Sequence, residues 1–240
     1  MKGVSFQNGV EFKITIDGES WAQGDTIRGK IESKPAASVH VYLVEGIDKK
    51  VKAKSADAFV VLNEQKADQG PMEWTFDTSL DSRISDKAGS LYVLYGNQEN
   101  LEKLGLLRLN IIPHLIIRDL IDLCGSHFRF VPKGFTFTKA GETEVKLDPP
   151  ATQEWTSLEQ LQIFFEMRND TLHSRFLFYK KEIDATKGGI VTHIVKREFK
   201  RDWKLALIVH DFNQRLNKEI LAIELEKVVA EYKDAGWLTS

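Results

Sequence analysis

Cys124 and His127 are the residues whose types and spacing come nearest to chemistry in this chain of 240 residues. A thiol beside an imidazole base is the arrangement of an activated cysteine nucleophile. The two residues stand three positions apart at the end of an expected helix, and no third residue that would orient the imidazole is identifiable. We therefore predict a buried structural thiol and no catalytic residues, and a cysteine-dependent hydrolase is the least favoured function.

Metal and phosphate sites are not expected either. His114, Asp119 and Asp122 could supply ligands, but His114 and Asp119 stand five positions apart, off the i, i+4 face that a helical ligand pair needs. The other histidines are scattered, and the sequence has no Gly-x-Gly-x-x-Gly, Gly-Lys-Ser or Gly-Lys-Thr loop. We expect no metal and no cofactor.

The main basic cluster runs from Lys196 to Lys204 and interleaves aromatic residues. Such a run is typical either of a surface for an anionic lipid, nucleic acid or acidic partner, or of a strand edge protected by lysine and arginine. Glu198 and Asp202 dilute the charge, so we favour the protected edge. If this region contacts a partner, the residues expected to do so are Lys196, Arg197, Lys200, Arg201, Trp203 and, nearer the C-terminal end, Trp237.

Charge and cysteine content narrow the class of protein. The chain has 33 basic and 35 acidic residues and a net charge of -2, so we expect no nucleic-acid partner and at most weak binding to an anionic surface. A single cysteine cannot form an internal disulfide and favours a reducing compartment. The N-terminal residues do not resemble a signal peptide, and no apolar run is long enough to span a bilayer, so we expect a cytoplasmic protein.

The first half of the chain is rich in strand patterns. Val10 to Ile16 alternates apolar and polar residues, which is typical of a half-buried strand. The segment Gln23-Gly24-Asp25 predicts a turn, and Gly29 lies in the strand that follows it. The count of seven to eight short strands is typical of a β-sandwich. The further expected strands are 25–32, 39–44, 51–54, 59–63, 72–77, 90–95 and 104–112.

Pro113 ends this pattern and predicts a short amphipathic helix over 114–123, with Gly125 as its C-cap. Strand patterns then resume, and a helical period returns from Asn213 to Lys233, with Gly236 at the expected stop. The period leaves 203–209 undecided between helix and strand. The later expected strands are 128–131, 135–138, 143–147, 155–165, 172–180 and 190–199.

Together these patterns predict a mainly β chain of two tandem β-sandwiches with a C-terminal amphipathic helix. The expected parts are a first sandwich over 1–112, a second sandwich-like domain over 113–204, and a C-terminal segment over 205–240. The terminal helix could dock on its own domain or on another molecule, and we favour its own domain.

Two segments carry a resemblance to a known superfamily. The hairpin at 23–31 and the loop and strand at 80–95 are similar to segments of the arrestin-like proteins. In the second half, the helix, glycine and strand at 122–130 and the hairpin at 157–180 resemble the bacterial sporulation-control branch. The resemblance implies a non-enzymatic adaptor or scaffold that binds protein partners through strand edges, loops and the terminal helix.

A second function remains open, a lipid or small-ligand binding β-sandwich protein with an apolar cleft. It is motivated by the many phenylalanines of the second half, most of which are more simply core residues. They are Phe128, Phe130, Phe135, Phe137, Phe164, Phe165, Phe176 and Phe178. The identity of a partner and the oligomeric state do not follow from the residues.

Overall fold

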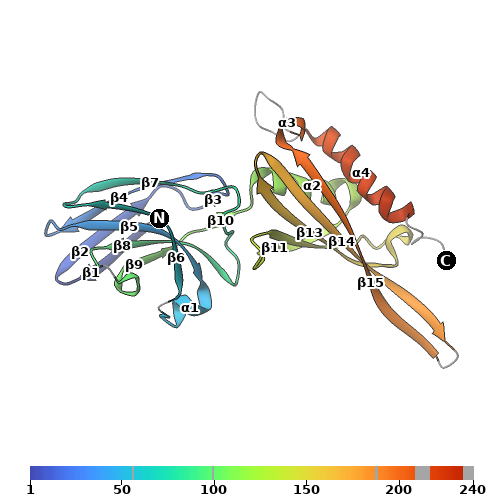
Figure 1. Cartoon of the computed structure of the whole chain (residues 1–240), viewed down its shortest axis with the longest axis horizontal. Coiled ribbons are helices and arrows are strands. Elements are labelled where there is room, and N and C mark those ends of the chain that lie inside the picture. Colours follow the sequence, from blue (N-terminus) through green and yellow to red (C-terminus); the bar gives the residue numbers. More distant parts are fainter. Residues whose placement is uncertain (56, 99, 187–188, 209–216, 235–240) are drawn as a thin grey trace. The chain divides into compact units, whose positions relative to one another are not determined.

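The computed structural model describes residues 1–55, 57–98, 100–186, 189–208 and 217–234. The chain divides into two compact units, Met1–His114 and Leu115–Ser240. Most described elements are strands (Figure 1). The C-terminal helix belongs to the second unit, whereas the sequence suggested a separate segment over 205–240.

The first unit contains two four-stranded sheets and a short parallel pair. In spatial order, one sheet holds β1 (Lys2–Gln7), β2 (Val10–Ile16), β4 (Thr26–Lys34) and β7 (Met72–Asp77). The other sheet holds β6 (Phe59–Ala67), β5 (Val39–Ile47), β8 (Gly89–Gly96) and β9 (Gly105–Arg108). The parallel pair is β3 (Trp21–Ala22) with β10 (Ile111–Ile112). Two short helical turns, α1 (Asp48–Lys52) and η1 (Leu101–Lys103), lie in the connections.

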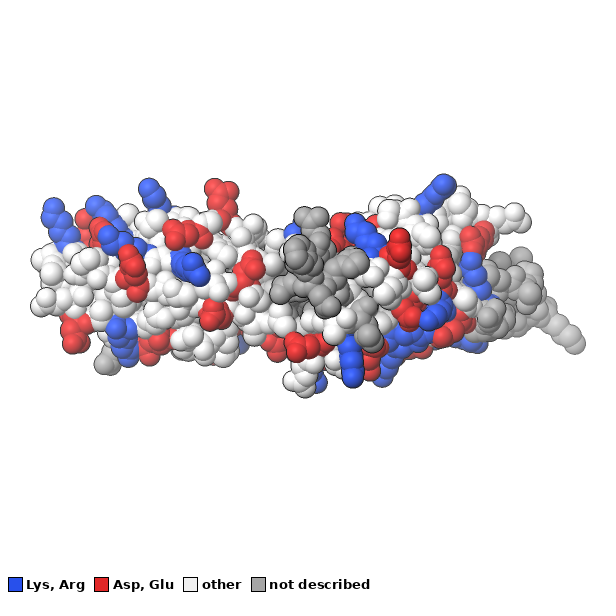
Figure 2. All heavy atoms as spheres, turned by 90° about the horizontal axis from the view of Figure 1, so that it is seen from above, with Lys and Arg blue, Asp and Glu red and all other residues white. Residues whose placement is uncertain are grey.

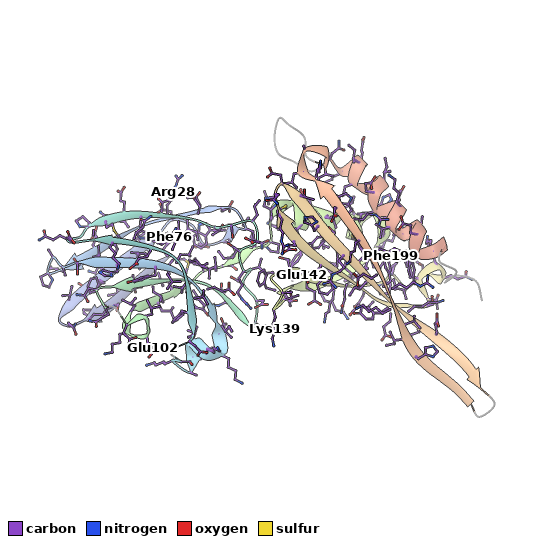
Figure 3. The ribbon with its side chains drawn as sticks, in the orientation of Figure 1. Arg28, Phe76, Glu102, Lys139, Glu142 and Phe199 are labelled. Atoms are coloured by element: carbon purple, nitrogen blue, oxygen red, sulfur yellow. The ribbon has the colours of Figure 1, made fainter. Side chains whose placement is uncertain are left out.

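Apolar side chains from the two four-stranded sheets form one core, as the alternation predicted. Phe12 of β2 and Phe76 of β7 come from one sheet and Val41 of β5 from the other, and all three are 0% exposed and belong to the same apolar cluster. Figure 3 shows Phe76 within this unit and Arg28, which is exposed, at its outer side. The expected first β-sandwich is therefore confirmed.

The turn at 23–25 and the close approach at Gly29 shape the hairpin. Gly24 has a positive φ of 90°, which favours glycine, and the Asp25 carboxylate accepts the Ala22 amide N–H at 2.6 Å. A Cβ on Gly29 would lie 2.4 Å from the Trp74 ring and 2.5 Å from the Thr15 carbonyl oxygen. These residues build the fold, as expected from the sequence.

Three glutamine side chains join separate segments of the first unit by hydrogen bonds to backbone groups. Buried Gln7 of β1 donates to the Tyr95 carbonyl oxygen at 3.1 Å and accepts the Asn97 amide N–H at 3.1 Å. Gln65 of β6 makes the same pair of bonds with the backbone of Thr75 in β7. Gln23 donates to Ser82 and accepts from the backbone of His114. We call these three side chains the glutamine clips.

Three predictions for the first unit need correction. The segment 51–54 is not a strand, because 48–52 forms α1, whose Val51 packs on an apolar cluster outside the main core. The expected strand 104–112 is divided into β9 and β10, which pair with different strands. Strand β1 was missed, since only its Gln7 is fully buried and the exposed Val4 and Phe6 break the usual pattern.

The second unit has one five-stranded antiparallel sheet in the order β11-β12-β13-β14-β15. Its strands are β11 (Val131–Phe137), β12 (Thr143–Asp148), β13 (Leu158–Arg168), β14 (Thr171–Thr186) and β15 (Gly189–Lys204). Its helices are α2 (Leu115–Phe128), η2 (Gln153–Trp155), α3 (Leu205–Ile208) and α4 (Lys218–Asp234). The mainly β class, the helix at the start of the second half and the C-terminal helix are confirmed.

Helices, instead of a second sheet, cover the described sheet of the second unit (Figure 1). The apolar faces of α2 and α4 include the buried Leu120 and Leu225, and Tyr232 of α4 stacks on Phe178 of β14 at 4.3 Å between ring centroids. The expectation of a second sheet-on-sheet sandwich is therefore corrected to a sheet with a helical layer. The physical reason is that two amphipathic helices bury the apolar face of one sheet as well as another sheet would.

Helix α2 continues past the predicted stop at Gly125. The helix ends where Arg129 takes a positive φ of 62° and its N–H bonds the Gly125 carbonyl oxygen at 3.0 Å. The expected strand at 128–131 therefore begins only at Val131. The predicted helix start at Asn213 and stop at Gly236 lie outside the described residues. Among the described helices, none has the length and hydrophobicity needed to cross a bilayer.

Candidate partner-binding site

The predicted basic cluster lies on β15, the last strand of the five-stranded sheet, and strand alternation divides it between two faces. Trp203 is 6% exposed and packs edge-on against Phe176, with 6.0 Å between the ring centroids. Arg201 forms an ion pair with Glu231 of α4. Two of the predicted contact residues therefore stabilise the helix layer, and Trp203 is a core residue.

The opposite face of β15 carries the remaining lysines of the cluster. Lys200 is exposed and lies 3.4 Å from the Glu198 carboxylate. Lys196 and Arg197 are also exposed, but they are neighbours in the strand and alternation directs them to different faces. The structure thus does not gather the five described residues of this set into one surface, and the sixth, Trp237, lies outside the described residues.

A polar groove of about 250 Å³ lies on the sheet of the second unit. Arg175 stacks 4.1 Å above the Phe164 ring centroid, and its Nη2 donates to both carboxylate oxygens of Glu142 at 3.0 and 2.8 Å. His173 Nδ1 lies 2.7 Å from the Asp202 carboxylate. These contacts join β14 to the residue before β12 and to β15, so the side chains of the groove serve the sheet's own cross-strand contacts more than a substrate.

Cys124 and His127 do not form a catalytic pair. The Cys124 side chain is buried, and desolvation raises the pKa of its thiol to about 12, which keeps it protonated. His127 instead lies 2.8 Å from the Glu226 carboxylate of α4. The helix therefore presents its imidazole to another helix and its thiol to the core.

The apolar space beside Cys124 is too small for a ligand. It holds about 10 Å³ and is lined by Leu161, Phe176, Leu225 and other apolar side chains. Cavities that bind drug-sized molecules are about 300–1,000 Å³. Of the phenylalanines that motivated a lipid or small-ligand function, Phe165, Phe176 and Phe178 are at most 1% exposed and belong to the core.

Candidate metal ligands do not come together in the part of the chain that the structure describes, which contains no group of three or more His, Cys, Asp or Glu suited to a metal. His114 is a case in point. Burial lowers the pKa of its imidazole, an effect that nearby Asp25 partly opposes. Its backbone N–H donates to the side-chain oxygen of Gln23, so a hydrogen bond links the residue at the end of the first unit to the turn at 23–25.

The exposed apolar strand edges were missed by the sequence analysis. Val60, Val61 and Leu62 of edge strand β6 are 64%, 46% and 48% exposed. On edge strand β1, Val4 and Phe6 are 54% and 75% exposed. The run of three apolar residues at 60–62 departs from alternation, and this was the available indication that the strand is not an ordinary half-buried one.

The two units define a class of protein with an N-terminal antiparallel β-sandwich followed by a helix-covered antiparallel sheet. The chain is similar to the crystal structure of Spo0M, the sporulation control protein from Bacillus subtilis, with a TM-score of 0.58. The two proteins share 13% sequence identity, and the match covers 93% of this chain and 98% of Spo0M. No family model and no curated protein sequence matches the chain. The expected likeness to sporulation-control proteins is thus confirmed for the fold.

Proposed function

We propose that this protein is a non-enzymatic adaptor or scaffold of arrestin-like type that binds protein partners through strand edges. The observation that carries the proposal is the exposure of apolar side chains on the edge strands of both sheets of the sandwich. These are Val4 and Phe6 on β1, and Val60, Val61 and Leu62 on β6. Edge strands with exposed apolar residues invite pairing with another chain, and natural proteins usually protect them.

The fold similarity to Spo0M, a sporulation control protein, supports the same proposal by analogy of fold. The packing of α4 in the second unit is compatible with the proposed adaptor function. The apolar face of α4 packs within its own unit through residues such as Leu221, Leu225 and Val228, which are at most 3% exposed. The exposed Ile220 and Ile223 leave only the outer side of α4 for a partner.

The surface charge agrees with a protein partner more than with a polyanion. Lysines and arginines are interspersed with aspartates and glutamates on the face shown in Figure 2. A nucleic-acid site would require a continuous basic surface that neutralises several phosphates. We infer that specific pairing at an edge, with charges at its rim, gives the selectivity.

The test is affinity capture from a native lysate of the source cells, with the purified chain as bait at increasing concentration. The proposal predicts a partner whose capture saturates and is competed by the free chain. Single substitutions of exposed edge residues, Phe6→Lys on β1 or Val61→Lys on β6, should lower the capture. Failure to recover any saturable partner, together with turnover of a substrate library by the purified protein, would contradict the adaptor function.

A further inference from the structure

Strand β6 combines a free edge with exposed apolar side chains. It pairs only with β5, and no other described strand pairs with its outer side. Val60, Val61 and Leu62 follow one another and are all at least 46% exposed. Backbone N–H and C=O groups on such an exposed edge bond to water, and a strand from another chain can replace that water with ladder hydrogen bonds.

The common protections of an edge are found in the second half of β6. Glu64 and Lys66 form an ion pair of 2.7 Å, and Gln65 bonds to the backbone of Thr75. The two halves of β6 meet at a bulge, since Val61 is opposite Val44 and Asn63 is opposite Leu43, which leaves Leu62 as the extra residue. Residues 59–62 therefore form the open half of this edge.

Unpaired lysines lie beside that open half. Lys49 and Lys52 of α1 and Lys54 after it are exposed, and no ion pair joins them to a described residue. Lys50, in contrast, is paired with Asp57. The turn leads directly into β6, since the Ala58 N–H bonds the Ser55 carbonyl oxygen at 2.9 Å, and Figure 1 shows α1 beside the end of β6.

We propose that residues 59–62 of β6 bind an extended segment of a partner protein as an added strand, with acidic residues of that segment facing Lys49, Lys52 and Lys54. Main-chain hydrogen bonds would give the affinity, and apolar side chains of the segment would pack on Val60, Val61 and Leu62. The lysines fix the charge of the partner by complementarity. This inference rests on the proposed adaptor function and names the edge and the chemistry of its partner.

An extended peptide fits this surface better than a membrane does. The hydrocarbon interior of a bilayer offers no partner for unpaired backbone groups, each of which is costly to leave unsatisfied there. A peptide strand satisfies them and uses the exposed valines at the same time. A membrane surface and a second copy of this chain are the alternative occupants of the edge, and the experiment distinguishes both from a peptide.

The experiment selects binders from a random peptide library displayed on phage, with the full chain as target. The proposal predicts enriched peptides with alternating apolar residues and Asp or Glu at one end. The strongest peptide is then synthesised and titrated by fluorescence anisotropy. Val60→Lys with Leu62→Lys, and separately Lys49→Glu with Lys52→Glu, should each weaken its binding by about tenfold or more.

Matched controls distinguish binding at the β6 edge from non-specific binding to exposed apolar side chains. Leu115→Lys removes an apolar side chain of α2 that is 60% exposed and lies outside the proposed edges, and it should leave peptide affinity unchanged. Methylation of alternate backbone nitrogens in the peptide keeps its side chains but removes donors, and it should abolish binding. Circular dichroism melts of every variant check that the fold is kept.

Several results would overturn the inference. They are no enriched acidic-apolar sequence, equal affinity in the β6 variants, or a methylated peptide that still binds. Sedimentation showing a dimer that Val60→Lys dissolves would assign the edge to a second copy. Binding to phosphatidylserine vesicles that Lys49→Glu with Lys52→Glu removes would assign it to a membrane. If the β6 variants still capture the lysate partner and Phe6→Lys does not, the adaptor function stands and the assignment to β6 fails.

Discussion

Gly125 lies inside α2, where glycine costs conformational entropy without being needed for a positive φ. An added Cβ would lie 3.5 Å from the Phe130 carbonyl oxygen, an ordinary contact. Gly125→Ala should therefore raise the free energy of unfolding by about 0.5–1 kcal/mol, measured by urea unfolding followed by circular dichroism. The matched control is Gly29→Ala, which should destabilise because its Cβ would lie 2.5 Å from the Thr15 carbonyl oxygen. A lower urea midpoint for Gly125→Ala would contradict the account of α2.

At the same scale, the Cys124 thiol should be unreactive in the folded chain. Burial raises its pKa from 9.0 to about 12, so almost no thiolate exists at pH 8 and a disulfide reagent should react much faster after unfolding. A raised folded pKa means that the thiol's contribution to stability is complete below pH 9 and is lost as the pH rises toward 12. Cys124→Ala should therefore flatten the decline of stability with alkaline pH. Rapid labelling of the native chain at pH 8 would contradict burial of the thiol.

At the scale of elements, the glutamine clips are expected to stabilise the first unit by joining separate segments of its chain. Gln7→Leu leaves the Tyr95 carbonyl oxygen and the Asn97 N–H without their side-chain partner, and should lower the free energy of unfolding by about 1–3 kcal/mol. Gln65→Leu is the matched control, since its bonds to Thr75 are exposed to water, which can replace them. Chemical denaturation measures both. Equal, small losses in the two variants would show that the buried clip has no special role.

Helix α4 is expected to be part of the second unit's core and not a helix held for a partner. Leu225 is 3% exposed, so Leu225→Ala should cost about 2–5 kcal/mol of stability. Ile223, which is 53% exposed on the same helix, is the control, and Ile223→Ala should change stability by no more than about 0.5 kcal/mol. Thermal melts of the two variants decide the matter. A tolerant Leu225→Ala would indicate that α4 does not pack on its own unit.

The elements differ in how far the residues predicted them. Alternation located β2 and β7, because each buries one face in the core, but it missed β1, whose exposed Val4 and Phe6 stand where polar residues are expected. The clip between Gln7 and Tyr95 joins residues 88 positions apart, and no local pattern indicates such a bond. From its adjacent charges, the cluster on β15 was expected to be either a partner surface or, as the favoured case, a protected strand edge. Applying the period of two to it would have separated Arg201 and Trp203 from Lys200.

For the whole molecule, the account rests on what the two units leave exposed and what they bury. The second unit buries Phe165, Phe176, Phe178 and the Cys124 thiol. Both units leave apolar side chains exposed on edge strands, and the first unit has three in a row at 60–62. An exposed large apolar feature is informative about association in a way that a buried one is not. The similarity to Spo0M concerns the fold, so the partner must be established on this chain.

The most direct measurement of the central claim is hydrogen–deuterium exchange of the full chain with and without its saturable partner from the lysate. The adaptor account with its site on β6 predicts slower exchange of the amides at 59–62, because added strand pairing protects them, and little change along β2 in the interior of its sheet. Protection confined to α4 or to the polar groove around Arg175, with β6 and β1 both unchanged, would contradict binding through strand edges.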